Sequence, residues 1–567
     1  MAANRIDPRE KYSPYVPVEL PDRQWPSQTI KTAPVWCSVD LRDGNQALPI
    51  PMSREEKVAY FQLLVELGFK EIEVGYPSAS ETDFAFVRHL ITEAMIPEDV
   101  TIQVITPCIE ELIDRTFDAI VGAPRVILHF LNGTSPLQRE LVYLADEEAT
   151  VSLAKTAAAY IRKKGEAAKQ AGMAITYEYS PESFSETEPT FALTIVEAVL
   201  DTLEASASAP VIINLPATVE KCAPNQYADL VEWFARRLRD KARVVLSIHP
   251  HNDRGTAVAA AEMALLAGAQ RVEGTLFGNG ERTGNADLLT LAMNMYTQGV
   301  ETGLCFQEIN KVREVFEAVT RMKVGARHPY AGELVYTAFS GAHQDAILKV
   351  INYRKKRKLS GWQVPYLPLD PADVGRQYEP IIRINSQSGK GGAGFIMESL
   401  FGYQIPKAML PELSLVVKEK ADRENIEITG ETLLGIFDTE FISVQTPYSL
   451  ESYRTAYLNE EDEEDNEVRF LGTVKENGVL KEVEGKGNGP IDALYDALKT
   501  LGAADYEFVS YAQHAISGGS DSRAIAYIQL RDKEGRTRFG AGTSKDIKKA
   551  SLRALISAIN RMSRRDA

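Results

Sequence analysis

Short apolar runs and longer amphipathic stretches alternate along roughly the first 300 residues of the chain, which is typical of strands and helices in turn. The runs are rich in valine and isoleucine, as buried strands are. The stretches between them repeat apolar residues at helical spacing and include Arg54–Leu67, Glu148–Ala171, Tyr227–Leu238 and Thr256–Ala267. The pattern predicts eight strands, at Val35–Val39, Glu71–Val74, Thr101–Ile105, Val126–Phe130, Ala174–Tyr179, Val211–Leu215, Val244–Ile248 and Val272–Leu276.

Regular alternation of strands and helices implies right-handed βαβ units around a parallel sheet. Eight units over about 260 residues match a closed (β/α)8 barrel, or TIM barrel, and the alternative is a doubly wound open sheet. Two features favour the barrel: the fingerprint GxGxxG does not follow the first strand, and polar residues recur at the carboxyl ends of the strands, which a barrel gathers at one mouth. These polar residues are Asp43, Thr106, His129, Glu178, Glu182, Asn214, Thr218, His249, His251, Asn279 and Asn285.

The repeating pattern ends after the eighth unit, which divides the chain into regions. We expect the barrel to occupy residues 31–325, behind an N-terminal extension of residues 1–30. Residues 326–435 are expected to form helical linker subdomains. Residues 436–567 are expected to form a C-terminal α/β domain that contains an almost entirely acidic linker, 459–467.

Within these later regions the elements are less regular. A helix is predicted at Glu333–Val350, and Gln363–Pro380 is predicted to be a proline-rich connector. The terminal module shows no internal repeat at the level of sequence identity. Its predicted strands and helices are Arg469–Val474, Gly489–Leu501, Tyr506–His514, Ser522–Leu530, Arg536–Ser544 and a last helix ending near Met562.

The composition is that of an ordinary folded protein, with 44% hydrophobic and 25% charged residues. The net charge of −16 argues against generic binding to nucleic acid, because phosphate backbones need a basic surface. The four cysteines are widely scattered, which favours a reducing compartment. The chain shows neither a run of about 18 apolar residues nor an apolar signal segment, so we expect a cytoplasmic protein without a membrane span.

The strongest candidate for chemistry is a set of three residues, Asp43, His249 and His251. Residues two apart on a strand face the same side, so both imidazoles are expected to point into the barrel mouth. Asp43 ends the first strand, which lies close to the seventh in a ring of eight. One carboxylate and two imidazoles suit a catalytic divalent cation with open coordination positions. A pair of solvent-exposed histidines is the alternative.

Three residues near this set can act on a bound substrate. Arg42 can stabilise negative charge that develops on an oxygen atom, or it can pair with a barrel carboxylate. Glu182 follows the fifth strand and is a candidate general base, and an acid favoured at a helix N-terminus is the alternative. Gln46, in the string LRDGNQ, either orients a substrate or bonds the backbone of the turn.

Two glycine clusters stand out. GNGERTG, at Gly278–Gly284, precedes Asn285, which is either a plain helix N-cap or a residue that contacts the metal or a ligand. Glu281 is either the carboxylate partner of a metal-binding histidine or an acid that faces solvent. GKGG, at Gly389–Gly392, lacks the P-loop spacing and is predicted to be a hinge or a tight turn.

Together these motifs resemble those of the acyl-CoA-dependent Claisen condensing enzymes, a family of barrels similar to HMG-CoA lyase. The resemblance covers nearly the whole chain and is strongest to the long-form branch that makes 2-isopropylmalate. The strings that carry it are PVWCS (Pro34–Ser38), LRDGNQ (Leu41–Gln46), HPHND (His249–Asp253), GNGERTGN (Gly278–Asn285), NSQSGKGG (Asn385–Gly392) and GNGP (Gly487–Pro490).

The resemblance implies that acetyl-CoA, 3-methyl-2-oxobutanoate and water give 2-isopropylmalate and CoA, the first committed step of leucine biosynthesis. A divalent ion would polarise the 2-oxo acid; Mg²⁺, Mn²⁺ and Zn²⁺ all suit the donors, and a monovalent cation is a further option. A lone helical histidine such as His343 is usually structural, so its catalytic role rests on the resemblance alone. The implied residues are Arg42, Glu182, His343 and Tyr378 for catalysis, Asp43, His249, His251 and Asn285 for the metal, and Gln46, His129, Thr218 and Glu281 for substrate binding.

The resemblance also implies a homodimer, in which the N-terminal extension and the post-barrel helices reach the partner subunit, and a C-terminal regulatory domain that binds leucine as an inhibitor. A glycine-rich turn would offer backbone donors to the leucine carboxylate beside an apolar pocket. The alternatives are a citramalate or homocitrate synthase, which accepts another 2-oxo acid, and a catalytically inactive barrel that senses leucine. The implied leucine-binding residues are Gly487, Asn488, Gly489, Tyr511, Ala515 and Ile516.

Overall fold

The chain forms two compact units, each of which contains a segment far from the rest of it in sequence. The first unit comprises Met1–Val335 and Leu369–Gln377, and the second comprises Tyr336–Pro368 and Tyr378–Ala567. Most of the acidic linker, and residues 385–389 of the string NSQSGKGG, lie outside the described residues. The structure, a computed structural model, describes residues 8–338, 340–378, 390–424, 428–457, 467–516 and 522–564.

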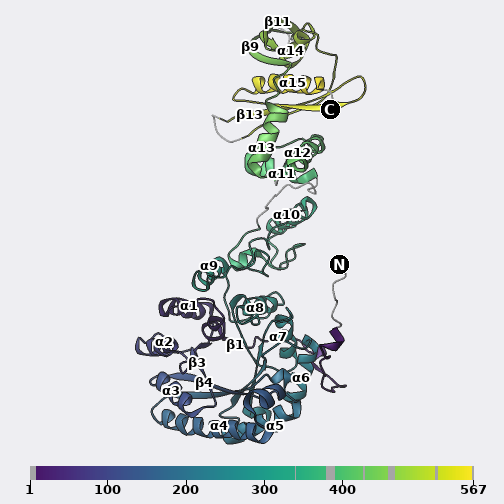
Figure 1. Cartoon of the computed structure of the whole chain (residues 1–567). Helices are drawn as coiled ribbons and strands as arrows, with labels where there is room; N and C mark the ends of the chain where they lie inside the picture. The colour runs from purple at the N-terminus through teal and green to yellow at the C-terminus, as the bar shows by residue number, and fades with distance from the viewer. Residues whose placement is uncertain are drawn as a thin grey trace. The chain divides into compact units, whose positions relative to one another are not determined.

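Eight parallel strands close the first unit into a barrel, in which the first strand pairs with both the second and the eighth (Figure 1). The predicted (β/α)8 barrel is confirmed and the open sheet is excluded. Each predicted strand overlaps an observed one. The strands are β1 (Val35–Ser38), β2 (Glu71–Gly75), β3 (Thr101–Pro107), β4 (Arg125–Gly133), β5 (Ala174–Glu182), β6 (Val211–Ala217), β7 (Val244–Pro250) and β8 (Arg271–Gly274).

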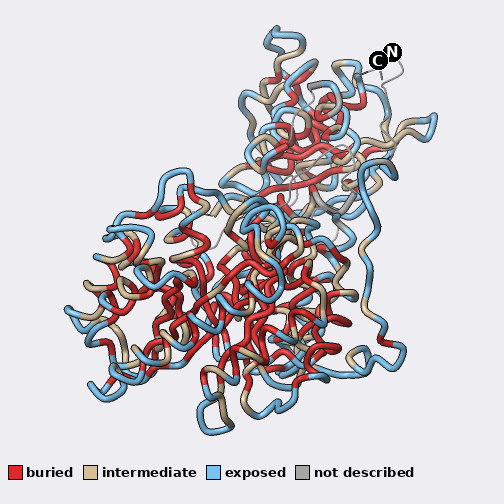
Figure 2. Tube along the Cα trace, turned by 60° about the horizontal axis from the view of Figure 1, so that its bottom comes forward, coloured by how far each residue is buried: buried red, intermediate tan, exposed pale blue. Residues whose placement is uncertain are grey.

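Helices surround the barrel, and buried residues concentrate along the strands inside them (Figure 2). Local signals set the ends of the first helix, because Ser53 and Glu56 form a capping box and Gly68, with φ of 101°, ends it. The helices of this unit are α1 (Arg54–Leu67), α2 (Glu81–Thr92), α3 (Glu110–Ile120), α4 (Glu147–Gln170), α5 (Pro189–Thr202), α6 (Pro224–Arg237), α7 (Ala257–Leu266), α8 (Leu288–Tyr296) and α9 (Ile309–Thr320).

The eighth strand ends at Gly274, two residues before the predicted end. The buried carboxylate of Asp40 accepts the backbone N–H of Leu276 at 3.0 Å, which takes that residue out of the strand ladder. A 3-10 turn, Leu276–Gly278, follows and leads into the glycine-rich segment. The loop after β8 therefore begins close to the turn after β1.

The described part of the N-terminal extension packs against α6 of its own barrel. Asp229 accepts hydrogen bonds from Arg23 Nε and from Trp25 Nε1, both at 2.8 Å. Glu232 accepts the backbone N–H of Gln24 at 2.9 Å and that of Trp25 at 2.9 Å. These ion pairs and hydrogen bonds fix residues 23–25 within one subunit. The predicted contact with a partner subunit stays a prediction.

Four helices open the second unit: α10 (Gly341–Arg357), α11 (Lys390–Phe401), α12 (Leu410–Glu424) and α13 (Gly430–Phe437). The helix predicted from Glu333 begins only at Gly341, because the N–H of Leu334 bonds the carbonyl of Ala326 in a turn. The hinge predicted at GKGG is wrong for Lys390, Gly391 and Gly392, which begin α11.

The C-terminal part of the chain repeats one topology twice, a three-stranded antiparallel meander followed by a helix. The sequence shows no identity between the two copies, and β9 and β11 were not predicted. The first copy is β9 (Tyr448–Tyr457), β10 (Val468–Glu476), β11 (Val479–Gly487) and α14 (Pro490–Lys499). The second is β12 (Glu507–Ala515), β13 (Ala524–Arg531), β14 (Thr537–Ser544) and α15 (Ile547–Ser563).

Strand β13 is buried on both faces and joins two hydrophobic cores. Ala526, Ile528 and Leu530 pack with α14 and α15, whereas Ile525 and Tyr527 pack with α11, α12 and α13. The sheet β12–β13–β14 therefore has the helices α11–α13 on one face and the helices α14 and α15 on the other.

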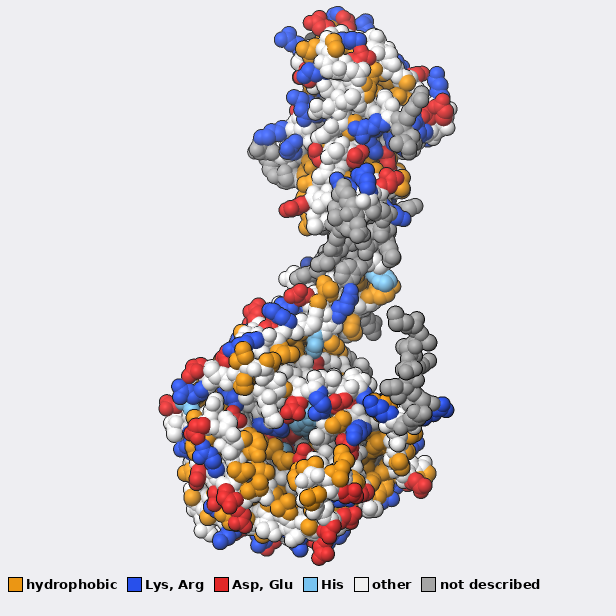
Figure 3. Space-filling view, viewed as in Figure 1, with side chains coloured by type: hydrophobic (Ala, Val, Ile, Leu, Met, Phe, Trp, Pro, Cys, Tyr) orange, Lys and Arg blue, Asp and Glu red, His pale blue; other side chains and the backbone are white. Residues whose placement is uncertain are grey.

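None of the described helices is long and apolar enough to span a membrane. Acidic and basic side chains are interspersed on the face of the barrel unit shown in Figure 3.

Candidate functional site

The carboxyl ends of the barrel strands surround a cavity of about 330 Å³. Its walls combine charged side chains with apolar ones such as Ile105, Leu131 and Pro216, a mixture that suits a small ligand with polar and apolar parts. Nine of the residues predicted to form the site line this cavity: Arg42, Asp43, Gln46, His129, Glu182, Thr218, His249, His251 and Glu281.

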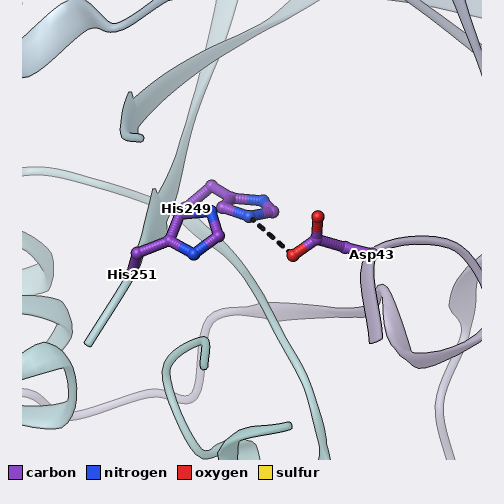
Figure 4. Close-up of side chains that lie close together, drawn as sticks. All are labelled: Asp43, His249 and His251. Carbon is purple, nitrogen blue, oxygen red and sulfur yellow. Dashed lines mark ion pairs between the residues drawn. The ribbon is translucent and has the colours of Figure 1, made fainter. Parts of the chain in front are cut away.

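Asp43, His249 and His251 converge on one space in the cavity (Figure 4). Asp43 lies in a short helical turn after β1; His249 lies at the end of β7, and His251 directly follows that strand. Nε2 of His249 is 3.7 Å from Oδ2 of Asp43, and the two imidazole ring centres are 5.2 Å apart. One ligand atom from each residue lies within 4.8 Å of the other two. The alternative of two solvent-exposed histidines is excluded, because both are buried.

Burial and neighbouring charges set the protonation of these three side chains. Burial alone would raise the pKa of Asp43, but Arg42 and the histidines hold it well below its usual range. Burial alone would lower the pKa of His249, but the carboxylates of Asp43 and Glu273 raise it to about 9. Burial and the nearby His249 lower the pKa of His251 to about 4. At neutral pH and without a bound ion, Asp43 is a carboxylate and His251 a neutral imidazole, whereas His249 keeps a proton on both ring nitrogens; a bound cation would displace the proton from its Nε2.

Asn285 lies directly beside Asp43. A β-bridge pairs it with His251, and its Nδ2 donates to Oδ2 of Asp43 at 2.6 Å. It is not the N-cap of α8, because Asp287 caps that helix by accepting the N–H of Leu289. The plain N-cap alternative for Asn285 is therefore wrong.

The donor atoms present fit a divalent cation. Among the described residues, nothing hydrogen-bonds Nδ1 of His251 or Oδ1 of Asn285, although both atoms are buried. Buried polar atoms are nearly always paired, so two unpaired atoms on residues of this site point to a ligand. Nitrogen and oxygen donors of this kind suit Mn²⁺ and Zn²⁺, and the oxygen atoms suit Mg²⁺.

Arg42 is held by two carboxylates at the edge of the cavity. Its Nε donates to Oε2 of Glu73 at 2.6 Å, and its Nη1 donates to Oδ1 of Asp43 at 2.9 Å. Both interpretations of Arg42 from the sequence are compatible with this geometry, since the guanidinium pairs with a barrel carboxylate and also lines the cavity.

Glu182 ends β5 and lines the cavity, and burial raises its pKa. A 3-10 turn separates it from α5, which begins at Pro189, so the interpretation of Glu182 as an acid at a helix N-terminus is wrong. The next residue along, Ser183, donates its backbone N–H to Oγ1 of Thr218 at 2.9 Å. This bond ties the end of β5 to the loop after β6.

His129 lies in the middle of β4 and is more buried than the other predicted substrate-binding residues. Its Nε2 contacts Oγ of Ser180 at 2.7 Å, and its Nδ1 lies 3.3 Å from Oε1 of Glu73. The side chain is buried, contacts polar partners and lines the cavity.

Gln46 and Glu281 lie together at the rim, where Nε2 of Gln46 donates to Oε1 of Glu281 at 3.1 Å. The carboxylate that contacts a histidine is Glu273, with Oε2 at 2.7 Å from Nδ1 of His249. The interpretation of Glu281 as a histidine partner is therefore wrong. Glu273 was missed, although two charged residues spaced two apart, Arg271 and Glu273, in a strand expected to be buried were the available signal.

A layer of buried polar residues lies beneath the site, and the sequence interpretation missed most of it. The cluster of His129, Glu178 and Glu273 has the spacing of a metal site. However, the guanidinium of Arg271 already lies 2.9 Å from Glu273 and 3.4 Å from Glu178. Because this cluster contains its own cation, it is not a second metal site. The layer comprises Glu73, Gln103, Glu178, Arg271 and Glu273.

His343 and Tyr378 belong to the second unit, whereas the residues that line the cavity belong to the first. His343 lies in the first turn of α10 and stacks on Tyr366, with ring centres 3.9 Å apart. Tyr378 packs against a small apolar cluster that includes Ile347 and Val364. The catalytic roles of His343 and Tyr378 stay predictions.

The predicted leucine-binding residues fall into two groups on different sheets. Gly487, Asn488 and Gly489 connect β11 to α14, where the N–H of Asn488 bonds Asp492 at 3.1 Å. Tyr511 lies on β12 and contacts Ser551 of α15 at 2.8 Å. The remaining two residues, Ala515 and Ile516, lie at the end of β12.

Three family models match the chain in succession. They describe an HMGL-like region at residues 33–316, an alpha-isopropylmalate synthase, post-catalytic domain-like region at residues 333–398, and a LeuA allosteric (dimerisation) domain at residues 427–563. The first region contains the barrel and its cavity.

Curated relatives match over almost their full length. The 2-isopropylmalate synthase of Clostridium acetobutylicum is 49% identical over 551 residues, which cover 97% of this chain and 99% of the relative. The enzyme of the same name from Rhodospirillum rubrum is 50% identical over 559 residues, which cover 98% of this chain and 99% of the relative. The chain therefore belongs to the 2-isopropylmalate synthases, a family of acyltransferase enzymes.

Proposed function

We propose that this protein condenses acetyl-CoA with 3-methyl-2-oxobutanoate and hydrolyses the resulting thioester, so that one water is consumed and 2-isopropylmalate and CoA are released. This is the first committed step of leucine biosynthesis. The main support is the convergence of Asp43, His249 and His251 with Arg42 and Glu182 around one cavity. Near-full-length identity of about half to enzymes of that name supports the same reaction.

Each cavity residue has a role that its contacts support. Asp43, His249 and His251 would hold a divalent cation, with Asn285 beside them; when bound, such an ion polarises the keto group of the 2-oxo acid. Arg42 stabilises negative charge that develops on the substrate oxygen. The half-buried carboxylate of Glu182 removes a proton from the methyl group of acetyl-CoA. Gln46, His129, Thr218 and Glu281 bind and orient the substrates.

The test of the reaction is an assay of CoA release with a panel of 2-oxo acids. We expect 3-methyl-2-oxobutanoate to give the highest kcat/KM, and chelation of divalent ions to abolish turnover until Mg²⁺ or Mn²⁺ is returned. A preference for pyruvate or 2-oxoglutarate would instead assign citramalate or homocitrate synthesis. Leucine binding without any metal-dependent turnover would identify an inactive sensor.

A homodimer is part of the same proposal, with His343 and Tyr378 supplied to the cavity by the partner subunit. An apolar run in the loop after β4 supports a subunit contact, because Leu141 and Leu144 are 68% and 83% exposed. Mixing two inactive variants, His343→Ala and Glu182→Gln, tests shared sites. If sites combine residues of two subunits, random mixed dimers should regain about a quarter of wild-type activity. No recovery on mixing would place both residues in one subunit's site.

Inhibition by leucine is the regulatory part of the proposal. The Gly487–Gly489 turn offers backbone N–H groups, and the end of β12 offers apolar side chains. Leucine bound there inhibits only if its affinity differs between an active and an inactive state of the enzyme. Titrating leucine against wild type and a Tyr511→Ala variant should show weaker inhibition in the variant, and equal inhibition would contradict the site.

A further inference from the structure

The two histidines of the site are held differently. Nδ1 of His249 lies 2.7 Å from Oε2 of Glu273, whereas Nδ1 of His251 is buried without a hydrogen-bond partner among the described residues. An imidazole that binds a metal through one nitrogen carries its proton on the other nitrogen. The contact with Glu273 fixes that proton at Nδ1 of His249. It leaves Nε2, the nitrogen that faces Asp43, as the ligand atom.

Glu273 is itself held rigidly, because both of its oxygen atoms accept further hydrogen bonds. Oε1 accepts from Arg271 Nη1 at 2.9 Å and from Gln103 Nε2 at 3.0 Å. Oε2, the atom that contacts His249, also accepts from Asn214 Nδ2 at 3.0 Å. The side chain of Glu273 has no exposed surface, so water does not compete for these bonds.

Arg271 anchors this arrangement to the wall of the barrel. It lies two residues before Glu273 on β8, so both side chains point into the barrel interior. Its guanidinium donates to Ser247 on β7 at 2.8 Å, to Gln103 on β3 at 2.6 Å and to Glu71 on β2 at 2.5 Å. Bonds to three other strands leave the guanidinium, and the carboxylate that it holds, little room to move.

We propose that Glu273, anchored by Arg271, is a positioning residue that sets the tautomer and orientation of His249 for metal binding. This inference rests on the proposed function, in which His249 is a metal ligand. The competing explanation is that Glu273 only neutralises Arg271. Glu71 and Glu178 also pair with that guanidinium, and of these three carboxylates Glu273 is the one in contact with His249.

The test compares two substitutions that change a carboxylate into an amide of the same size. Glu273→Gln alters the partner of His249, because an amide has an N–H and an oxygen and no longer selects one tautomer. Glu71→Gln is the matched control, since Glu71 accepts from the same guanidinium and lies at the opposite end of β2 from the cavity. Mn²⁺ is titrated into metal-depleted full-length protein, and the free ion is measured by electron paramagnetic resonance.

We expect Glu273→Gln to weaken Mn²⁺ binding by about 10- to 100-fold and Glu71→Gln to change it less than about twofold. Equal affinity in Glu273→Gln and wild type, or equal losses in both variants, overturns the inference. If Glu273→Gln does not fold, Asn214→Ala replaces it, because it removes one bond to the same oxygen; unchanged affinity there also overturns the inference. Wild-type protein that binds no Mn²⁺, Mg²⁺ or Zn²⁺ would contradict the proposed function instead.

Discussion

Asp43 is the residue on which the contacts of the site converge. It accepts hydrogen bonds from Arg42 and Asn285 and faces His249, so the turn after β1, the loop after β8 and the end of β7 meet at one carboxylate. Desolvation of this charge is offset by the cation and the imidazoles around it. The same balance keeps the carboxylate ionised and available to a metal ion.

Replacing Asp43 by Asn retains its shape and removes its charge. We expect Asp43→Asn to lose divalent-metal binding and at least about 100-fold in activity, since loss of a ligand exceeds the effect of losing an outer partner. His251→Ala should behave in the same way. Metal content by elemental analysis and the far-ultraviolet circular dichroism spectrum are measured together. Wild-type turnover in either folded variant, after chelation and return of metal, would rule out the ligand assignment.

If Glu182 is the general base, kcat/KM should depend on pH. Burial raises its pKa, and a base acts only when deprotonated, so kcat/KM should fall as pH decreases through a value above the usual carboxyl range. Glu182→Gln should lower kcat by about 10²- to 10⁴-fold and lose this acidic limb. Glu186→Gln, in the turn that follows, is the control and should retain the wild-type profile. A Glu182→Gln variant with an unchanged profile would show that another group is the base.

Among the elements, the loop after β8 is built most tightly around the site. Gly284 has φ of 98°, and a Cβ atom there would collide with the carbonyl oxygen of Gly278. That backbone approach folds the loop so that Asn285 reaches Asp43. Gly299 has a similar φ of 81°, and a Cβ atom there would meet no other heavy atom within 4 Å. A substitution at Gly299 is therefore a control that introduces the backbone strain of a positive φ without a steric clash.

Gly284→Ala should therefore weaken Mn²⁺ binding and lower the melting temperature, because the loop must open to accommodate the methyl group. Gly299→Ala should cost about 1–2 kcal/mol of stability through its positive φ and leave Mn²⁺ affinity unchanged. Calorimetry and metal titration of both variants check this. Equal metal affinity in the two variants would show that the fold of this loop does not control the site.

At the scale of the whole molecule, the sheet β12–β13–β14 packs against helices on both faces, so it determines which truncated variants keep their hydrophobic cores covered. A variant that ends at residue 467 leaves β9 without β10 and removes Ile525 and Tyr527 from the core of α11–α13. We expect this variant to aggregate and to bind a hydrophobic dye. A variant that ends at residue 389 removes both partners together, so it should stay soluble and lose its response to leucine. Equal solubility of the two would contradict a shared core. Light scattering measures the difference.

Strand periodicity was sufficient to predict the barrel and the meeting of Asp43 with His249 and His251, because side chains two apart on a strand share a face and the ends of parallel strands share a mouth. Local sequence did not predict α11 through GKGG. Gly394, later in that helix, shows what such glycines permit, since a Cβ atom there would collide with the side chain of Leu410 in α12. A glycine at this position lets α11 approach α12 closely, which is a tertiary contact that the local sequence does not record.

By itself the sequence determined the eight βα units, the three candidate metal ligands and their family, since these depend on short-range periodicity and on contiguous strings. Only the tertiary structure decided that Asn285 bonds Asp43, that Glu273 rather than Glu281 contacts His249, and that Arg271 supplies the cation of the second acidic cluster. His249 and Glu273 are 24 residues apart in the sequence, and Asp43 and Asn285 are 242 residues apart. Arg271 and Glu273 share β8, but the other partners of Arg271 come from other strands of the barrel. Such contacts form only when the barrel closes, so no local pattern records them.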